Sequence, residues 1–225
     1  MQNKKSKLIV IDGLDGSGKS TQFALVQDNL TKNNIKYRAI SFPDYDKPSS
    51  TLVKMYLNGE FSNNADEINA YAASSFYAVD RYASFKLYWE DYYNSDGLIL
   101  ASRYVSSNAI HQMVKLPKKS WDDYLHWLED YEYNKLGLPK PDRTIFLDMP
   151  VEVSQKLLDN RYNGDISKKD IHESNIEYLR RCRETALYAA DKLGWIVLEC
   201  NSDNLPIAIE IINEKLMKMI NGVIK

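Results

Sequence analysis

The fold of this 225-residue chain is decided by the stretch Leu8-Ile-Val-Ile-Asp-Gly-Leu-Asp-Gly-Ser-Gly-Lys-Ser20. Its first four residues form a short apolar run, which is typical of a buried β-strand. The segment from Gly13 to Ser20 fits the pattern G-x-x-x-x-G-K-[ST], and a helical spacing of apolar residues begins near Ser20. A strand, a glycine-rich loop and a helix in this order predict a P-loop, the phosphate-binding motif of many nucleotide-binding proteins.

The residue types of this loop suit a polyphosphate. Glycines let the backbone wrap closely around the phosphates, toward which the backbone N–H groups and the positive end of the helix then point. Lys19 brings a positive charge to the β- and γ-phosphates, and the Ser20 hydroxyl is the expected Mg²⁺ ligand. The residues expected to bind ATP and its metal are Gly13, Asp15, Gly16, Ser17, Gly18, Lys19, Ser20 and Thr21.

Further apolar runs alternate with helical patterns along the chain. Strands are predicted over residues 8–11, 37–42, 97–101, 144–147 and 195–198, and residues 65–93 are predicted to form one long helix or two. Strand–helix alternation implies crossover connections and a parallel sheet. We therefore expect a three-layer α/β/α P-loop NTPase fold, with a five-stranded parallel sheet and helices on both faces. No convincing linker interrupts the chain, so a single domain over residues 1–225 is predicted.

Composition narrows the range of partners. The formal charge of −2 lacks the basic surplus of a nucleic-acid-binding protein. No stretch approaches the ~20 apolar residues of a membrane span, and the apolar run 8–11 is too short for a signal peptide core. Cys182 and Cys200 are not arranged as a CxxC pair, which disfavours a zinc site or a disulfide scaffold. These features predict a cytoplasmic protein that binds neither nucleic acid nor membrane.

P-loop proteins include GTPases, motors and small-molecule kinases. Asn134-Lys-Leu-Gly137 lacks the final Asp of the N-K-x-D motif with which GTPases read guanine. Motors are usually larger and carry a hydrophobic strand that ends in a metal-binding Asp. The third predicted strand here ends in Ala101-Ser102, whereas the fourth ends in Leu147-Asp148. A small-molecule kinase is the favoured class.

Five segments in order resemble the thymidylate kinase family. They are Gly13-Leu-Asp15-Gly16, Ser41-Phe42-Pro43-Asp44, Phe76-Tyr77-Ala-Val-Asp80-Arg81, Ser102-Arg103-Tyr104 and Leu138-Pro-Lys-Pro-Asp142. The resemblance spans roughly residues 8–198. It implies transfer of a phosphoryl group from ATP to dTMP in dTTP biosynthesis, with Mg²⁺ and in a homodimer.

The resemblance also implies how the acceptor is held. Asp15 would accept a hydrogen bond from the deoxyribose 3′-hydroxyl, Arg81 would donate to the thymine carbonyl edge, and Tyr77 would stack on the ring. The alternative is that Tyr77 is a core residue and Arg81 a surface ion-pair partner. Arg103 would hold the acceptor phosphate, since guanidinium binds phosphate through two hydrogen bonds. The residues expected at the acceptor are Asp15, Phe42, Pro43, Tyr77, Arg81, Arg103, Ser107, His111 and Gln112.

Two of these assignments leave alternatives. Arg103 would instead pair with Asp44 or Asp80 if its role were structural. His111 is placed near the sugar and base by the resemblance, together with Gln112. It is not expected to act as a base, because phosphoryl transfer depends mostly on positioning and charge stabilisation.

A mobile lid is predicted over residues 160–170. Some family members carry a catalytic arginine in the P-loop where this chain has Gly16, and others supply it from the lid. Arg161 is therefore the expected catalytic arginine, assisted by Lys168 and Lys169, and it completes the catalytic set with Lys19 and Arg103. A plain surface loop is the alternative.

Two positions depart from the family pattern. Ser102 replaces an Asp that helps to organise Mg²⁺, and Tyr45 replaces an arginine that in some relatives helps to bind the acceptor phosphate. A neutral hydroxyl is a weaker partner for Mg²⁺ than a carboxylate. Two alternatives therefore stay open: a kinase for another deoxynucleotide or a nucleoside, and a nucleotide-binding homologue with weak or lost turnover.

Overall fold

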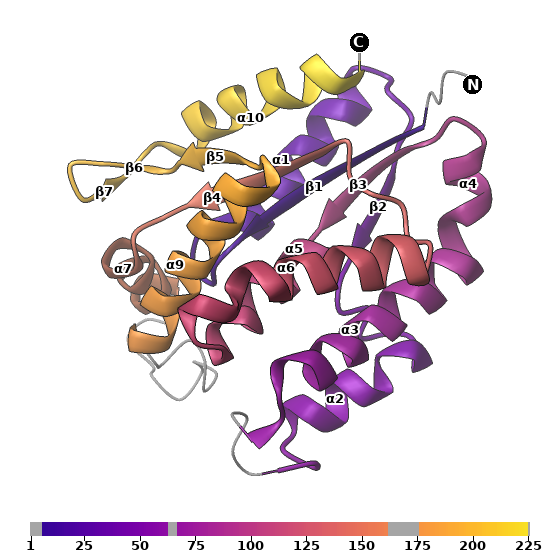
Figure 1. Cartoon of the computed structure of the whole chain (residues 1–225). Coiled ribbons are helices and arrows are strands. Elements are labelled where there is room, and N and C mark those ends of the chain that lie inside the picture. Colours follow the sequence, from indigo (N-terminus) through magenta and orange to yellow (C-terminus); the bar gives the residue numbers. More distant parts are fainter. Residues whose placement is uncertain (1–5, 63–66, 162–175, 225) are drawn as a thin grey trace. The chain divides into compact units, whose positions relative to one another are not determined.

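The computed structural model describes residues 6–62, 67–161 and 176–224, without the side chains of residues 159–161. Its main sheet has five strands in the order β2-β3-β1-β4-β5 (Figure 1). Their bounds are β1 (Lys7–Gly13), β2 (Arg38–Ser41), β3 (Leu98–Ser102), β4 (Arg143–Asp148) and β5 (Ile196–Glu199). β2 pairs with β3 in parallel, and so does β4 with β5. The five predicted strands and the parallel sheet surrounded by helices are confirmed.

The chain forms two compact units, and β1 contributes to both. The first comprises residues 1–10 and 36–142. It contains the strands β2 and β3. Its α-helices are α2 (Thr51–Leu57), α3 (Ala70–Ser84), α4 (Glu90–Asn94), α5 (Val105–His111) and α6 (Trp121–Glu129). A π-helical turn over Phe85–Trp89 joins α3 to α4, so the predicted helical region contains two helices. A second π-helical turn, Asp130–Lys135, follows α6.

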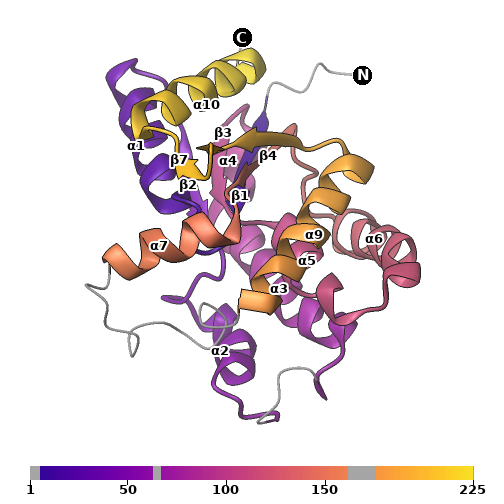
Figure 2. The ribbon, with the colours of Figure 1, turned by 90° about the vertical axis from the view of Figure 1, so that its left-hand side faces the viewer.

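The second unit comprises residues 11–35 and 143–225. Its helices are α1 (Lys19–Lys32), α7 (Val151–Arg161), α9 (Ile176–Leu193) and α10 (Ile209–Ile224). α10 lies beside α1 (Figures 1 and 2), and a chain of amide side chains joins them: Asn213 donates to Gln22 Oε1 (3.1 Å) and accepts from Asn29 Nδ2 (2.9 Å). The short antiparallel pair β6 (Asn201–Ser202) and β7 (Leu205–Pro206) was not predicted from the sequence.

Burial explains which strands the sequence marks most clearly. The four residues Leu8–Ile11 of β1 are fully buried, and so are Ile145, Phe146 and Leu147 of β4. Strands covered on both faces favour continuous apolar runs. The edge strand β2 is largely exposed, which agrees with its mixed composition.

The structure bears on the expectations about the cysteines, membrane spans, the lid and the domain count. Cys182 and Cys200 are both buried, and neither forms a disulfide in the described structure. Among the described residues, no helix combines the length and the apolar character needed to cross a bilayer. The predicted lid lies outside the described residues, apart from the helical backbone of residues 160 and 161 at the end of α7. The single domain over residues 1–225 stays a prediction.

Candidate functional site

The P-loop of the second unit ends at a helix whose first amides have no side-chain cap. Gly18 adopts a left-handed conformation (φ 83°) and is the N-cap residue of α1, which begins at Lys19. No side chain caps this end, and the first turn carries no acidic residue. The first N–H groups of a helix have no partner within the helix and favour an anion. This end of α1 is thus suited to bind phosphate.

Position 16 requires glycine because of both its backbone conformation and its close neighbours. Its φ is 76°, and an added Cβ would lie 2.9 Å from the Ser154 carbonyl oxygen and 3.0 Å from Leu158 Cγ. Next to it, Ser17 Oγ is buried and has no hydrogen-bond partner within the described part of the chain. A buried hydroxyl without a partner is costly, and a phosphate oxygen would satisfy it.

A cavity of about 530 Å³ adjoins the loop within the same unit. This volume lies in the range of small-ligand sites. One wall is the loop itself. The remaining walls are mostly apolar. They come from the residue after β4, from α7, from the segment between β7 and α10, and from the first turn of α10: Met149, Leu157, Leu158, Pro206, Ile207, Ala208, Ile209, Glu210 and Ile212. Gln22 fixes this segment because its Nε2 donates to the Ile209 carbonyl at 2.9 Å. The cavity combines a phosphate-binding rim with an apolar interior, as a nucleotide requires.

The residues near the loop are compatible with Mg²⁺ bound mainly through substrate. Ser20 lies exposed in the first turn of α1, so its hydroxyl is accessible. Asp12 is fully buried, and its Oδ1 accepts a hydrogen bond from Gly13 N at 2.8 Å. The described residues contain no group of three His, Cys, Asp or Glu side chains that would form a protein-only metal cage. Mg²⁺ commonly uses one or two protein ligands together with substrate phosphates and water, so the hydroxyl fits this pattern.

In the first unit, Arg103 directly follows β3 and has an unusual backbone conformation. Its φ of 65° is left-handed, which costs a non-glycine residue about 1–2 kcal/mol. Such conformations cluster at functional sites, where the surroundings impose them. Arg103 Nη1 lies 2.9 Å from His111 Nε2. Because guanidinium can only donate, His111 accepts this bond and is neutral at Nε2.

The Ser41-Phe42-Pro43-Asp44 segment is tied to α3 and β3. Phe42 N donates to the Ser102 carbonyl at 3.1 Å, and the Phe42–Pro43 peptide is cis. The buried Asp80 carboxylate accepts from Asp44 N (2.9 Å) and Ser49 Oγ (2.6 Å). Burial and the negative charge of Asp80 raise the pKa of Asp44. Asp80 thus helps to fix the segment that includes Phe42 and Pro43.

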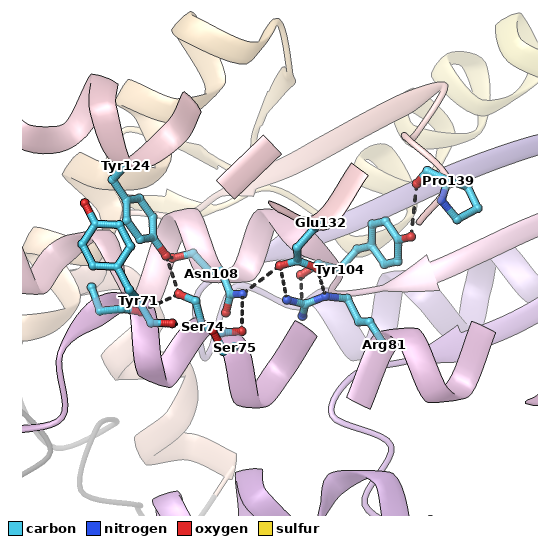
Figure 3. Close-up of polar contacts among 10 residues, drawn as sticks. Tyr71, Ser74, Ser75, Arg81, Tyr104, Asn108, Tyr124, Glu132 and Pro139 are labelled. Carbon is cyan, nitrogen blue, oxygen red and sulfur yellow. Dashed lines mark hydrogen bonds and ion pairs between the residues drawn. The ribbon is translucent and has the colours of Figure 1, made fainter. Parts of the chain in front are cut away.

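Arg81 lies in a buried polar network (Figure 3). Its side chain is 1% exposed, and two of its nitrogens donate to the Glu132 carboxylate: Nε to Oε2 at 2.6 Å and Nη2 to Oε1 at 2.5 Å. Nη1 donates to the Tyr104 carbonyl at 3.3 Å. Arg81 therefore forms an ion pair, but a buried one rather than the surface pair considered above. Tyr77 is half-buried with Tyr56 edge-on to it at 6.3 Å, and burial, reinforced by Tyr56, raises its pKa.

Two residues of this network were missed from the sequence. Glu132 lies in the π-helical turn after α6, and Asn108 lies in α5; both are buried. The only hint was an acidic residue between Tyr131 and Tyr133, where a burial-prone environment makes a charge unusual. Of the residues that were predicted near the acceptor, Gln112 is buried, and its Oε1 has no hydrogen-bond partner among the described residues.

The segment Leu138–Asp142, the last of the five that resemble the family, has a structural role. The carboxylate of Asp142 accepts a hydrogen bond from Leu8 N at 2.8 Å and pairs with Lys7 Nζ at 3.3 Å, while Asp142 N donates to the Leu8 carbonyl at 2.9 Å. Pro139 accepts from the Tyr104 hydroxyl at 3.1 Å. The Leu138–Asp142 segment therefore anchors the start of β1.

Comparisons with known proteins agree with these features. A family model described as thymidylate kinase matches residues 11–207. Thymidylate kinase from Mycobacterium tuberculosis is 26% identical over 201 residues, which cover 87% of this chain and 92% of that protein. Thymidylate kinase from Plasmodium falciparum is 26% identical over 218 residues, covering 94% and 90%. The solved structure of thymidylate kinase from Candida albicans shares the fold, with a TM-score of 0.69 and 21% identity over 98% of this chain and 94% of that chain. The chain therefore belongs to the thymidylate kinase family of phosphotransferases.

Proposed function

We propose that this protein transfers the γ-phosphoryl group of ATP to dTMP and thereby forms dTDP. The observation that supports it most strongly is the uncapped P-loop end of α1 beside a cavity of nucleotide size, in a chain of this family. In this proposal the loop residues 13–21 bind the triphosphate of ATP. Lys19 contacts its β- and γ-phosphates, and Ser20 is the protein ligand of Mg²⁺, which supplies charge neutralisation when bound.

The residues of the acceptor site are assigned from the resemblance to the family. Arg103 binds the phosphate of dTMP, and its strained backbone supports a functional role. Tyr77 stacks on the base, while Arg81 donates to the carbonyl edge of thymine. Asp15 accepts a hydrogen bond from the 3′-hydroxyl. Phe42, Pro43, Ser107, His111 and Gln112 complete the acceptor site in this proposal.

The reaction is an in-line attack by a phosphate oxygen of dTMP on the γ-phosphorus of ATP, with ADP as the leaving group. Lys19, Arg103 and Arg161 share the negative charge that develops on the transferred group. Arg161 is assigned from the resemblance, because its side chain lies outside the described residues. Closure of a lid over residues 160–170 would exclude water and so prevent hydrolysis of ATP.

Steady-state turnover with a panel of acceptors tests the proposal. ADP release coupled to dTMP, dUMP, dCMP, dGMP and thymidine is measured with Mg²⁺ and ATP, and dTMP is expected to have the highest kcat/KM. Phosphorylation of thymidine but not of dTMP would contradict the role of Arg103. Binding of ATP and dTMP with no ADP release above background would instead identify a homologue without turnover.

The location, oligomeric state and partners of the protein are assigned from the resemblance to the family. We propose that the protein is a cytoplasmic homodimer with small-molecule substrates and no nucleic-acid partner. Light scattering after size-exclusion chromatography tests the oligomeric state, and a mass of about 26 kDa would contradict the dimer.

A further inference from the structure

We propose that Glu132 is a positioning residue for recognition of the acceptor nucleotide. It fixes Arg81, which presents hydrogen-bond donors to the base, and Asn108, whose side-chain oxygen presents a hydrogen-bond acceptor beside them. This inference rests on the proposed function, because it concerns how the same acceptor site selects a base. Glu132 is fully buried and lies in the π-helical turn over Asp130–Lys135. Figure 3 shows its carboxylate between the other two side chains.

The carboxylate occupies three donors at once. Oε2 accepts from Arg81 Nε at 2.6 Å, and Oε1 accepts both from Arg81 Nη2 at 2.5 Å and from Asn108 Nδ2 at 3.0 Å. Burial alone would lower the pKa of Arg81, but the adjacent carboxylate raises it, so the guanidinium stays charged. Two parallel bonds to a carboxylate also fix the plane of the guanidinium.

The same contacts determine which way the Asn108 amide faces. Its nitrogen has two hydrogens, and both are used: one is donated to Glu132 and the other to the Ser74 carbonyl at 3.1 Å. Turning the amide over would place its oxygen against two acceptors. Asn108 Oδ1 is therefore held as an acceptor, and it receives no hydrogen bond from the described residues.

The network extends into α6, which stiffens the site. The Ser74 hydroxyl donates to the Ala70 carbonyl at 2.7 Å and lies 2.6 Å from the Tyr124 hydroxyl, which itself lies 3.3 Å from the Asn108 carbonyl. Because the Ser74 hydrogen is used by Ala70, the single Tyr124 hydrogen is shared between Ser74 Oγ and the Asn108 carbonyl. Burial raises the pKa of the Tyr124 hydroxyl, so it keeps this hydrogen.

The groups that remain match one kind of pyrimidine. Arg81 has five N–H donors and uses three on Glu132 and Tyr104 within the described structure, which leaves two. Thymine and uracil carry an acceptor, O4, next to a donor, N3–H. They complement the donors of Arg81 and the oxygen of Asn108. Cytosine has an amino donor at C4 and an acceptor at N3, so both contacts become repulsive. The pattern selects dTMP and dUMP over dCMP and does not separate the first two.

The variant Glu132→Gln tests this role. Its amide places a donor opposite a nitrogen of Arg81, which removes the charge-assisted contact and frees the guanidinium. We expect kcat/KM for dTMP to fall by about 10- to 100-fold, mostly through KM, in line with the loss of a hydrogen bond to a charged group. The decisive readout is the ratio of kcat/KM for dTMP to that for dCMP, which should fall at least about tenfold.

Asp148→Asn is the matched control. Asp148 is also a buried carboxylate with two bonds to an arginine, Arg183, at 2.6 and 2.7 Å, but it belongs to the second unit. This variant should lower thermal stability and leave the dTMP/dCMP ratio unchanged. A folded Glu132→Gln protein with the parent ratio would overturn the proposal. If that variant does not fold, Glu132→Asp keeps the charge but is too short to reach both partners, and an unchanged ratio there has the same meaning.

The unmodified protein gives a further test that separates the two proposals. If it phosphorylates dTMP and dCMP equally well, the inference about Glu132 fails while the proposed kinase activity stands. If it binds ATP but phosphorylates no pyrimidine nucleotide, the proposed function itself fails. A high dTMP/dCMP ratio in the parent that falls only in the Glu132 variants supports both.

Discussion

The P-loop and the Arg81 network bind polar groups in opposite ways. The loop offers backbone amides at the N-terminal end of α1, where no side chain caps them. The network in the first unit uses side chains from α3, α5 and the turn after α6, which hold one another in place. A backbone site depends on local conformation and is encoded within eight consecutive residues. A side-chain site depends on partners that are far apart in the sequence, and a local motif reveals only part of it.

The largest effect is expected from Lys19→Ala, which removes the positive charge at the end of the loop and leaves the backbone amides in place. The rate of phosphoryl transfer should fall on the order of 10³-fold, because the developing charge on the γ-phosphoryl group loses its partner. Steady-state ADP release measures the rate, and calorimetric titration with dTMP shows that the acceptor still binds. Turnover at the parent level would refute the assignment of this loop.

Arg103→Ala should have the next largest effect, on the acceptor side alone. Loss of a charged contact to phosphate should lower kcat/KM for dTMP on the order of 10²-fold. Arg103→Lys should recover only part of this, because an ammonium group lacks the planar two-donor geometry. The KM for ATP should stay near the parent value, and a selective loss of ATP affinity would show that Arg103 serves the donor instead.

Gly16→Ala sharpens the comparison by disturbing only the backbone site. Both Gly16 (φ 76°) and Gly137 (φ 68°) are left-handed, but only Gly16 has close neighbours at the position of an added Cβ. Each alanine variant should lose about 1–2 kcal/mol of unfolding free energy, measured by urea denaturation. The Gly16 variant should in addition bind ATP about tenfold more weakly, as the loop shifts away from Ser154. Equal ATP affinities in the two variants would show that the loop tolerates this shift.

The smallest effect is expected from Ser102→Asp, which restores the carboxylate typical of the family. Because a carboxylate is a better partner for Mg²⁺ than a hydroxyl, turnover should stay the same or rise by a few-fold. Turnover is measured across a range of Mg²⁺ concentrations, with Ser102→Asn as the uncharged control. A large fall in the Asp variant alone would mean that the metal is organised without this position.

The sequence predicts the two regions to different extents. All five strands of the main sheet were predicted from their apolar runs, which are most continuous in the buried strands β1, β3 and β4. The P-loop was predicted because its spacing fixes its geometry. The β6–β7 pair was missed, since each of its strands has only two residues and no periodicity can develop. Glu132 and Asn108 were missed because a burial-dependent contact between residues 24 positions apart leaves no local pattern.

The π-helical turn at Asp130–Lys135 makes the position of Glu132 sensitive to chain length. Such a turn contains one residue more than the α-helical turn it replaces. Deleting a single residue within α6, with the π-helical turn retained, would rotate each following side chain by about 100° about the helix axis. The Glu132 carboxylate would then point away from Arg81, although every other residue of the chain was unchanged. A deletion in α6 would therefore alter the base preference of this protein as effectively as a substitution of Glu132.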